Sequence, residues 1–383
     1  MTSENPSTSL STGGIASSPI SVISPVTQTG SAVSSPQILK VELGINGHPF
    51  VQASYKPGTG LSLDDQINLV KGLNAKWYRV PLNNLDQTLS VARLQGIKLL
   101  PVIMKAPTVL DTDSNDVVYQ KCYDYALQTV TKYKNDIKVW EITNELDIVA
   151  LLKKGDPTPL EYQKNGCNVG GIWNCGATSG INTYDYDETR YQRIKTIISG
   201  ISNGIKQADS EAQRMVNFAG WLHVGFVQRL ENDKVPYDIL SVHWYSGQGE
   251  ITCPGQTYPC PEKPTYFNVV TKLQQITNNK PMWMTEANYI YNAESTLDQD
   301  AQQSIYLSEL LSRYKNNPDK YPFQVVFVYE LLDEPYFGST NSESFYGLFK
   351  MTTSASGQRI LGPEKPICSS LRSIFAGQSF SSY

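Results

Sequence analysis

The chain has 383 residues, of which 40% are hydrophobic and 18% are charged, and its net charge at pH 7 is −4. It is long enough for a sizeable core, and because its sequence has no Lys/Arg-rich run, we expect neither nucleic acid nor an anionic membrane as a partner. No apolar stretch approaches the ~18 residues that a membrane-spanning segment needs.

The first 36 residues are rich in Ser, Thr, Pro and Gly, and they contain one charged residue, Glu4, and no aromatic residue. Such a segment cannot bury enough apolar surface to offset its chain entropy. We therefore expect residues 1–36 to be a disordered linker that precedes one catalytic domain, residues 37–383. The segment lacks the basic and apolar regions of a signal peptide, so we expect a leader peptide, if there is one, to be missing from this chain.

From Lys40 onward, β-type apolar runs alternate with helix-type runs. Several of the β-type runs are almost continuously apolar, as is typical of strands that are covered on both faces. The predicted strands are residues 40–47, 76–82, 97–104, 137–144, 214–220, 238–245, 280–287 and 323–331.

Helical patterns lie between the predicted strands, for example in residues 62–74, 85–96 and 189–209. Ser62 is the expected N-cap of the first helix, and Gly96 is the expected end of the second. Eight strands alternating with helices predict an α/β fold, a single (β/α)8 TIM barrel. The competing fold is a doubly wound sheet, but no Gly-rich nucleotide fingerprint follows the first strand.

The six cysteines include two closely spaced pairs in Gly/Pro-rich sequence, Cys167 with Cys175 and Cys253 with Cys260. Without nearby histidines these spacings favour disulfides over zinc. Cys122 and Cys368 lie in helix-like sequence and are expected to be buried thiols. Disulfides indicate a secreted, periplasmic or cell-surface protein.

Polar and aromatic residues gather at the predicted strand ends, which in a TIM barrel meet at the face that carries the active site. Glu145 ends strand 4 and Glu286 ends strand 7, so the two carboxyl groups should face each other across the barrel mouth. Enzymes that hydrolyse glycosidic bonds typically use two opposed carboxyl groups. The other candidates are Arg79, Asn144, Trp221, His243, Tyr245, Tyr329 and Glu330.

Three motifs, "WEITNE" (140–145), "HWY" (243–245) and "MTE" (284–286), occur in that order at predicted strand ends. Together they resemble the clan A glycoside hydrolases. "YRVPL", "WEITNEL" and "YELLDEP…YGLFK" are similar to family 39-like enzymes and their exopolysaccharide-cleaving relatives, and family 5 shares the motifs of strands 4, 6 and 7. The chain departs from these patterns at Leu146, where Pro is frequent, and at Tyr329-Glu330, where family 5 usually has Trp.

The resemblance implies a retaining mechanism in which Glu286 is the nucleophile and Glu145 is the acid/base. It further implies that Asn144 binds the sugar 2-hydroxyl. Tyr245 is expected to donate to Glu286, and Arg79 to pair with it. His243 is expected to contact the sugar or to brace Glu145. Trp221, Tyr329 and Glu330 complete the expected substrate-binding set.

The long loop over residues 146–187 and aromatic residues after the strands favour a cleft for a polysaccharide or exopolysaccharide and an endo-acting enzyme, although an exo-acting pocket also fits. The rings of these aromatic residues are expected to be exposed, because sugar faces stack on aromatic rings; the residues are Trp173, Tyr184, Tyr186, Tyr258, Tyr289, Tyr291, Tyr336 and Phe337.

Two alternatives from other classes are a non-catalytic carbohydrate-binding barrel and a metal-dependent hydrolase. The first would lose one of the two glutamates. The second needs ligand clusters that three scattered histidines do not suggest. We therefore expect a monomer with a carbohydrate substrate and neither a cofactor nor a metal.

Overall fold

The computed structural model describes residues 40–49, 61–153, 156–157, 160–161, 180–292, 294–355 and 359–377. The predicted linker, residues 1–36, lies outside the described residues, as do Trp173 and the predicted Cys167–Cys175 pair.

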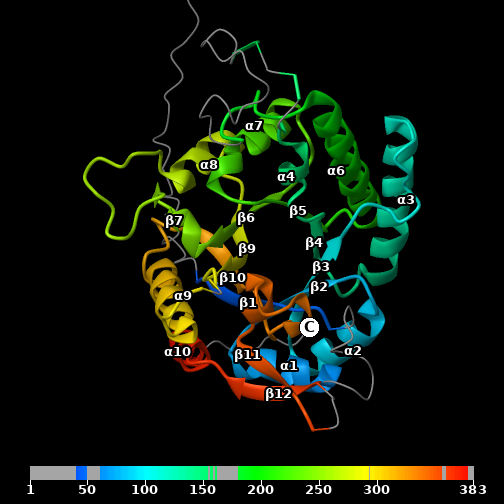
Figure 1. Cartoon of the computed structure of the whole chain (residues 1–383). Helices are drawn as coiled ribbons and strands as arrows, with labels where there is room; N and C mark the ends of the chain where they lie inside the picture. Colours follow the sequence, from blue (N-terminus) through cyan, green and yellow to red (C-terminus); the bar gives the residue numbers. More distant parts are fainter. Residues whose placement is uncertain are drawn as a thin grey trace, which may run out of the picture. The chain divides into compact units, whose positions relative to one another are not determined.

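Eight parallel strands close into a barrel in the order β1-β10-β9-β6-β5-β4-β3-β2, and β10 pairs with β1 to complete the ring. Figure 1 shows these strands at the centre with helices around them. Six of the eight strands lie within their predicted segments, β5 begins one residue before its segment, and β9 ends one residue after its segment. The predicted (β/α)8 barrel is therefore confirmed. The barrel strands are β1 (Glu42–Asn46), β2 (Trp77–Pro81), β3 (Lys98–Ile103), β4 (Val139–Ile142), β5 (Gln213–Phe218), β6 (Ile239–Tyr245), β9 (Met282–Asn288) and β10 (Phe323–Val328).

Helices cover the outer face of the barrel, and short 3-10 turns follow several strands. The helices are α1 (Leu63–Gly72), α2 (Leu85–Gln95), α3 (Asn115–Tyr133), α4 (Leu146–Ala150), α6 (Glu188–Ala208), α7 (Val224–Asn232), α8 (Val269–Thr277), α9 (Gln299–Asn316) and α10 (Ile367–Ile374). The turns are η3 (Trp221–His223), η4 (Ser246–Gln248), η5 (Pro335–Phe337) and η6 (Ser342–Phe345). Two antiparallel hairpins stand outside the barrel: β7 (Gly249–Glu250) with β8 (Cys253–Pro254), and β11 (Phe349–Thr353) with β12 (Arg359–Glu364).

Local sequence signals explain where the first helices begin and end. The Ser62 hydroxyl accepts a hydrogen bond from the backbone N–H of Asp65, which caps α1 as predicted. Gly96 follows α2 with a φ of 69°, the left-handed conformation that glycine adopts without steric cost.

Strand residues alternate between the outer helices and the barrel interior, because successive side chains point to opposite faces of a sheet. One cluster of interior residues is apolar and includes Trp77, Val139, Met215 and Trp283. Two positions further along the same strands stand the buried polar residues Arg79, Glu141, Asn217 and Thr285. The barrel therefore has an apolar floor and, above it towards the carboxyl ends of the strands, a polar layer.

The predicted disulfide between Cys253 and Cys260 is present, and it joins β8 to the loop that follows it. Cys122 of α3 and Cys368 of α10 are free and buried, as predicted. Among the described residues, no helix combines the length and hydropathy that crossing a membrane requires.

The barrel interior leaves no room for one extra methyl group on Gly44 of β1, which pairs with Phe327 of β10. A Cβ at Gly44 would lie 2.3 Å from the ring of Phe327. We predict that Gly44→Ala lowers the free energy of unfolding by ~1–3 kcal/mol, measured by urea denaturation. Gly72→Ala is the control, because a Cβ there meets nothing within 4 Å; an equal loss in both variants would contradict this prediction.

Candidate active site

The first carboxyl group of the site leaves β4 through an unusual turn. Thr143 has a φ of 62° and Glu145 a φ of 47°, both in the left-handed region that residues with a Cβ avoid. Asn217 of β5 holds this turn, since its amide donates to the Thr143 carbonyl at 2.8 Å and accepts from the Glu145 backbone N–H at 2.8 Å. The turn thus fixes the position of Glu145 at the barrel mouth, at the start of α4.

Arg79 of β2 lies at the centre of the polar layer. Its guanidinium donates to Glu141 at 2.5 Å, to Glu286 at 2.9 Å, to Asn46 at 3.2 Å and to Asn144 at 2.7 Å. Burial lowers the pKa of Arg79, but the charges of Glu141 and Glu286 outweigh burial and raise it overall. One buried cation therefore connects groups from β1, β4 and β9.

Glu286 of β9 is buried and receives a hydrogen bond on each carboxylate oxygen. Arg79 donates to Oε1 at 2.9 Å, and the Tyr245 hydroxyl donates to Oε2 at 2.7 Å. The two donors fix the direction of the carboxylate, and both contacts agree with the sequence-based expectation. Burial, followed by the charge of Glu286, raises the pKa of Tyr245 far above its ordinary value, so the hydroxyl keeps its proton and remains a donor.

Glu145 is more exposed than Glu286, with 26% of its side chain accessible against 8%. His243 Nδ1 lies 2.6 Å from Glu145 Oε1 and 3.5 Å from Glu286 Oε2. Burial lowers the pKa of His243, but the charges of Glu286 and Glu145 outweigh it, so the pKa is raised. One carboxylate oxygen of Glu145 and one of Glu286 lie within 4.8 Å of each other.

The other side of His243 is held by residues that the sequence analysis did not single out. Thr285 Oγ1 donates to Glu141 at 2.9 Å and lies 3.1 Å from His243 Nε2. Asn217 donates to the same Glu141 oxygen at 2.7 Å. Glu141 and Asn217 could have been found in the sequence, because each is a polar residue within an otherwise apolar strand, as in "VWEI" and "VNF".

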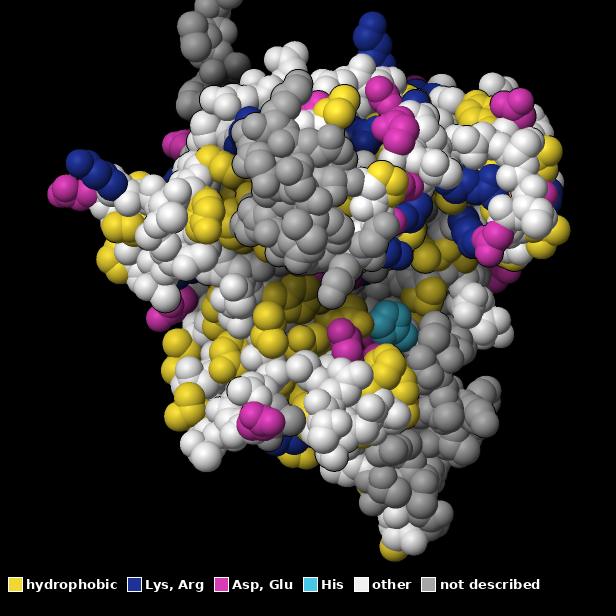
Figure 2. Space-filling view, turned by 45° about the horizontal axis from the view of Figure 1, so that its top comes forward, with side chains coloured by type: hydrophobic (Ala, Val, Ile, Leu, Met, Phe, Trp, Pro, Cys, Tyr) yellow, Lys and Arg dark blue, Asp and Glu magenta, His cyan; other side chains and the backbone are white. Residues whose placement is uncertain are grey.

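A cavity of about 400 Å³ opens beside Glu286. Of the predicted site residues, Arg79, Asn144, Glu286 and Tyr329 line it. Figure 2 shows a groove with many hydrophobic side chains, in which an acidic group and a histidine lie next to each other. The remaining lining residues are Asn46, Gly47, His48, Val80, Pro81, Leu82, Asn83, Val102, Met104, Lys105, Pro107 and Tyr125.

Five predicted site residues do not line this cavity. Glu145, His243 and Tyr245 lie in the group around Glu286 described above, whereas Trp221 and Glu330 do not belong to that group. Trp221, in η3 after β5, packs against Tyr266 with the ring centres 4.6 Å apart. Glu330 is almost fully buried beside His48. Of the predicted loop aromatics, Tyr186 and Tyr291 are buried and pack inside the fold, so the expectation of exposed rings is wrong for these two.

The long loop predicted after strand 4, residues 146–187, begins with the short helix α4, and about half of its residues lie outside the described ranges. Tyr258 and Phe337, by contrast with the two buried tyrosines, are exposed as expected.

In the part of the chain that the structure describes, two groups of side chains have the ligand types of a metal site: Glu145 with His243 and Glu286, and His48 with Glu330 and Glu334. In the first group Arg79 already donates to Glu286 at 2.9 Å, and a second cation at the same carboxylate would be repelled. The first group is therefore better suited to carboxylate chemistry than to a metal ion.

No protein-family model matches the chain, and no curated protein matches it. Among solved structures it is similar to a β-glucosidase from Thermotoga maritima in complex with a methoxycarbonyl-substituted glucoimidazole, at 12% identity, over 89% of this chain and 99% of that one, with a TM-score of 0.58. It is also similar to the AHE enzyme from Alicyclobacillus herbarius, at 12% identity, over 89% of this chain and 98% of that one, with a TM-score of 0.55.

A GH2 β-galacturonidase from Eisenbergiella tayi is similar at 15% identity with a TM-score of 0.52. The match covers 89% of this chain and 51% of that one, so the chain spans about half the length of the galacturonidase. At these identities the similarities show a shared barrel fold, and function has to be argued from the site.

The buried ion pair between Arg79 and Glu141 should matter far more for stability than an exposed one. We predict that Glu141→Ala lowers the free energy of unfolding by ~3–5 kcal/mol, because it leaves part of a buried cation unpaired. Asp136→Ala is the control: it removes the partner of Arg93, whose side chain is 49% exposed, and should cost less than ~1 kcal/mol. Urea denaturation measures both values, and similar losses would refute the prediction.

Proposed function

We propose that this protein is a retaining glycoside hydrolase that cleaves β-glycosidic bonds by double displacement. The observation that carries the proposal is the pair of carboxyl groups at the barrel mouth, with oxygens of Glu145 and Glu286 within 4.8 Å of each other. Retaining enzymes hold their two carboxyl groups about 5–5.5 Å apart, whereas inverting enzymes leave ~6.5–9.5 Å for a water molecule.

The surroundings of the two carboxyl groups support different roles. Glu286 is buried, and two donors hold its oxygens, so it is aimed as a nucleophile. Glu145 is partly exposed and contacts His243, so protons can reach it from solvent. This difference in environment is how two chemically equal groups take the roles of nucleophile and of acid/base.

The reaction proceeds in two displacements at the anomeric carbon. In the first, Glu286 attacks this carbon while Glu145 gives its proton to the leaving oxygen, and the glycosidic bond breaks. In the second, Glu145 takes a proton from water, and the water oxygen attacks the same carbon and releases Glu286. Two inversions restore the original configuration.

Asn144 is the proposed ligand of the sugar 2-hydroxyl. Its Oδ1 accepts from Arg79 at 2.7 Å and Asn144 lines the cavity, so the amide NH2 group is the donor that remains for a sugar. A hydrogen bond from this NH2 group to the 2-hydroxyl would strengthen in the transition state and lower the barrier.

The proposed substrate is a β-linked polysaccharide or exopolysaccharide that is cut internally. The open groove with its many hydrophobic side chains supports a chain-like ligand, because the apolar C–H faces of sugars can pack against such a surface. The β linkage is supported by analogy with the β-glucosidase and the β-galacturonidase that share the fold. The Cys253–Cys260 disulfide supports export.

Replacing either carboxyl group should nearly abolish hydrolysis of a panel of aryl β-glycosides and β-glucans. We predict that Glu286→Ala and Glu145→Ala each lower kcat/KM by at least ~100-fold on substrates with poor leaving groups. With a 2,4-dinitrophenyl β-glycoside and azide, Glu145→Ala should form the β-glycosyl azide and Glu286→Ala the α-glycosyl azide, as identified by NMR.

The exposed Glu211→Ala serves as the control and should keep wild-type rates. A wild-type protein that hydrolyses nothing in the panel, or that releases a product of inverted configuration, would overturn the proposed function.

A further inference from the structure

His48 stands at the carboxyl end of β1, directly after Asn46 and Gly47, and lines the same cavity as Glu286 and Tyr329. Its side chain is 27% exposed, and its ring packs edge-on against Tyr329 with centres 5.9 Å apart. Glu286 is one of the described residues that line this cavity, whereas Glu145 is not. In a double displacement the anomeric carbon bonds to the nucleophile, so the cavity beside Glu286 is where the glycone lies.

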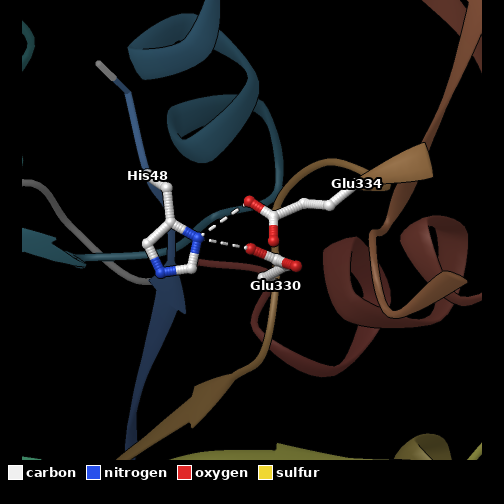
Figure 3. A group of neighbouring side chains, drawn as sticks. All are labelled: His48, Glu330 and Glu334. Carbon is white, nitrogen blue, oxygen red and sulfur yellow. Dashed lines mark hydrogen bonds and ion pairs between the residues drawn. The ribbon is translucent and has the colours of Figure 1, made fainter. Parts of the chain in front are cut away.

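Two buried glutamates hold His48 from behind (Figure 3). Its Nδ1 lies 2.9 Å from Glu330 Oε2 and 3.0 Å from Glu334 Oε1, while only 1% and 2% of the two glutamate side chains are exposed. Both glutamates follow β10, the strand that closes the barrel against β1. In Figure 3 the other ring nitrogen, Nε2, points away from both carboxyl groups.

The charges around His48 keep it protonated. Burial lowers its pKa, but hydrogen bonds and charges of Glu330 and Glu334 outweigh burial and raise the pKa to about 10. Burial raises the pKa of Glu330 to about 8, against the opposing hydrogen bond and charge of His48, and the charges of Glu334 and then Glu343 add smaller upward contributions. Both imidazole nitrogens of His48 therefore carry a proton at neutral pH.

We propose that His48 is a substrate-binding residue whose Nε2–H donates to a ring hydroxyl of the glycone, and that Glu330 and Glu334 hold its ring in place. This inference rests on the proposed function. Nδ1–H is engaged by the two carboxyl groups, so Nε2–H is the donor that remains for a ligand in the cavity.

The arrangement also selects a class of sugar. At neutral pH, His48, Glu330 and Glu334 together carry a net charge of zero or −1, according to whether Glu330 is protonated. Beside His48 a carboxylate on the sugar would meet no net positive charge from these three groups, and it would lie near Glu286 in the same cavity. Lys105 also lines the cavity, but its ammonium group lies 4.0 Å from the carboxylate of Asp111. The site therefore takes a neutral sugar at this position in preference to a uronic acid.

The first test compares His48→Ala and His48→Gln with the wild type on the aryl β-glycoside that the wild type hydrolyses best. We expect His48→Ala to lower kcat/KM by about 10–100-fold, the usual effect of losing a charged hydrogen bond, and His48→Gln to restore part of it. His223→Gln is the matched control, since His223 also pairs with a buried carboxylate, Asp147, but does not line the cavity. Circular dichroism and Tm confirm that each variant is folded.

The pH profile separates a held imidazolium from an ordinary histidine. A group with a pKa of about 10 stays protonated from pH 5 to 7.5, so the ratio of wild-type to His48→Gln kcat/KM should stay constant over this range. An unperturbed histidine, with a pKa of ~6.5, would lose its charge within it, and the ratio would fall. In the Glu334→Gln background the same ratio should fall above neutral pH, because one of the two negative partners is gone.

The selectivity test uses the neutral aryl glycoside and the uronide of the same ring configuration, which differ only at C6. We expect the wild type to prefer the neutral sugar by at least ~10-fold in kcat/KM. A preference for the uronide, or wild-type rates in His48→Ala, would overturn the inference while leaving the proposed function intact. A wild type that hydrolyses no glycoside would overturn both.

His48, Glu330 and Glu334 also have the ligand types of a divalent-cation site. A separate measurement decides between a metal site and a substrate-binding histidine. We expect EDTA to leave the activity unchanged and added Zn²⁺ or Ca²⁺ to leave Tm unchanged. A rise in Tm with either ion in the wild type but not in Glu334→Gln would show a metal site and overturn the inference.

Discussion

The structure of the site depends on one buried cation. Arg79 lies inside the barrel mouth, where a charge without partners would cost several kcal/mol, so carboxylates from neighbouring strands must be brought to it. Glu141 and Glu286 supply the negative charge that Arg79 needs, and Asn46 and Asn144 accept further hydrogen bonds from its guanidinium. Pairing the guanidinium thus places Glu286 and Asn144 at fixed positions before any substrate arrives.

The barrel makes such an arrangement possible because its interior is built in layers. The apolar floor of the barrel is filled by side chains such as Trp77, Met215 and Trp283. This packing supports the polar layer above it from below. The next residues on the same faces are polar and hydrogen-bond across strands, as Thr285 does to Glu141. A site supported by strands and a packed floor keeps its geometry, and this rigidity is what electrostatic catalysis requires.

The two sides of the mouth have different electrostatic tasks. On the side of β4 and β6, the buried His243 lies 2.6 Å from Glu145, which is partly exposed, and 3.5 Å from Glu286, which is buried. On the side of β1 and β10, His48 is held by two carboxyl groups that are almost fully buried. The first arrangement suits proton transfer, and the second suits a donor with a constant protonation state.

The sequence by itself determined the barrel, because eight apolar runs alternating with helical patterns leave few ways to cover both faces of a sheet. It also predicted that Glu145, Glu286, Arg79 and Tyr245 lie close together, since side chains at strand ends meet at one rim of the barrel. Only the tertiary structure showed that Glu141 neutralises Arg79 and that Glu330 lies behind His48. These partners are up to 282 positions apart in the chain, and only barrel closure brings them into contact, which no local pattern encodes.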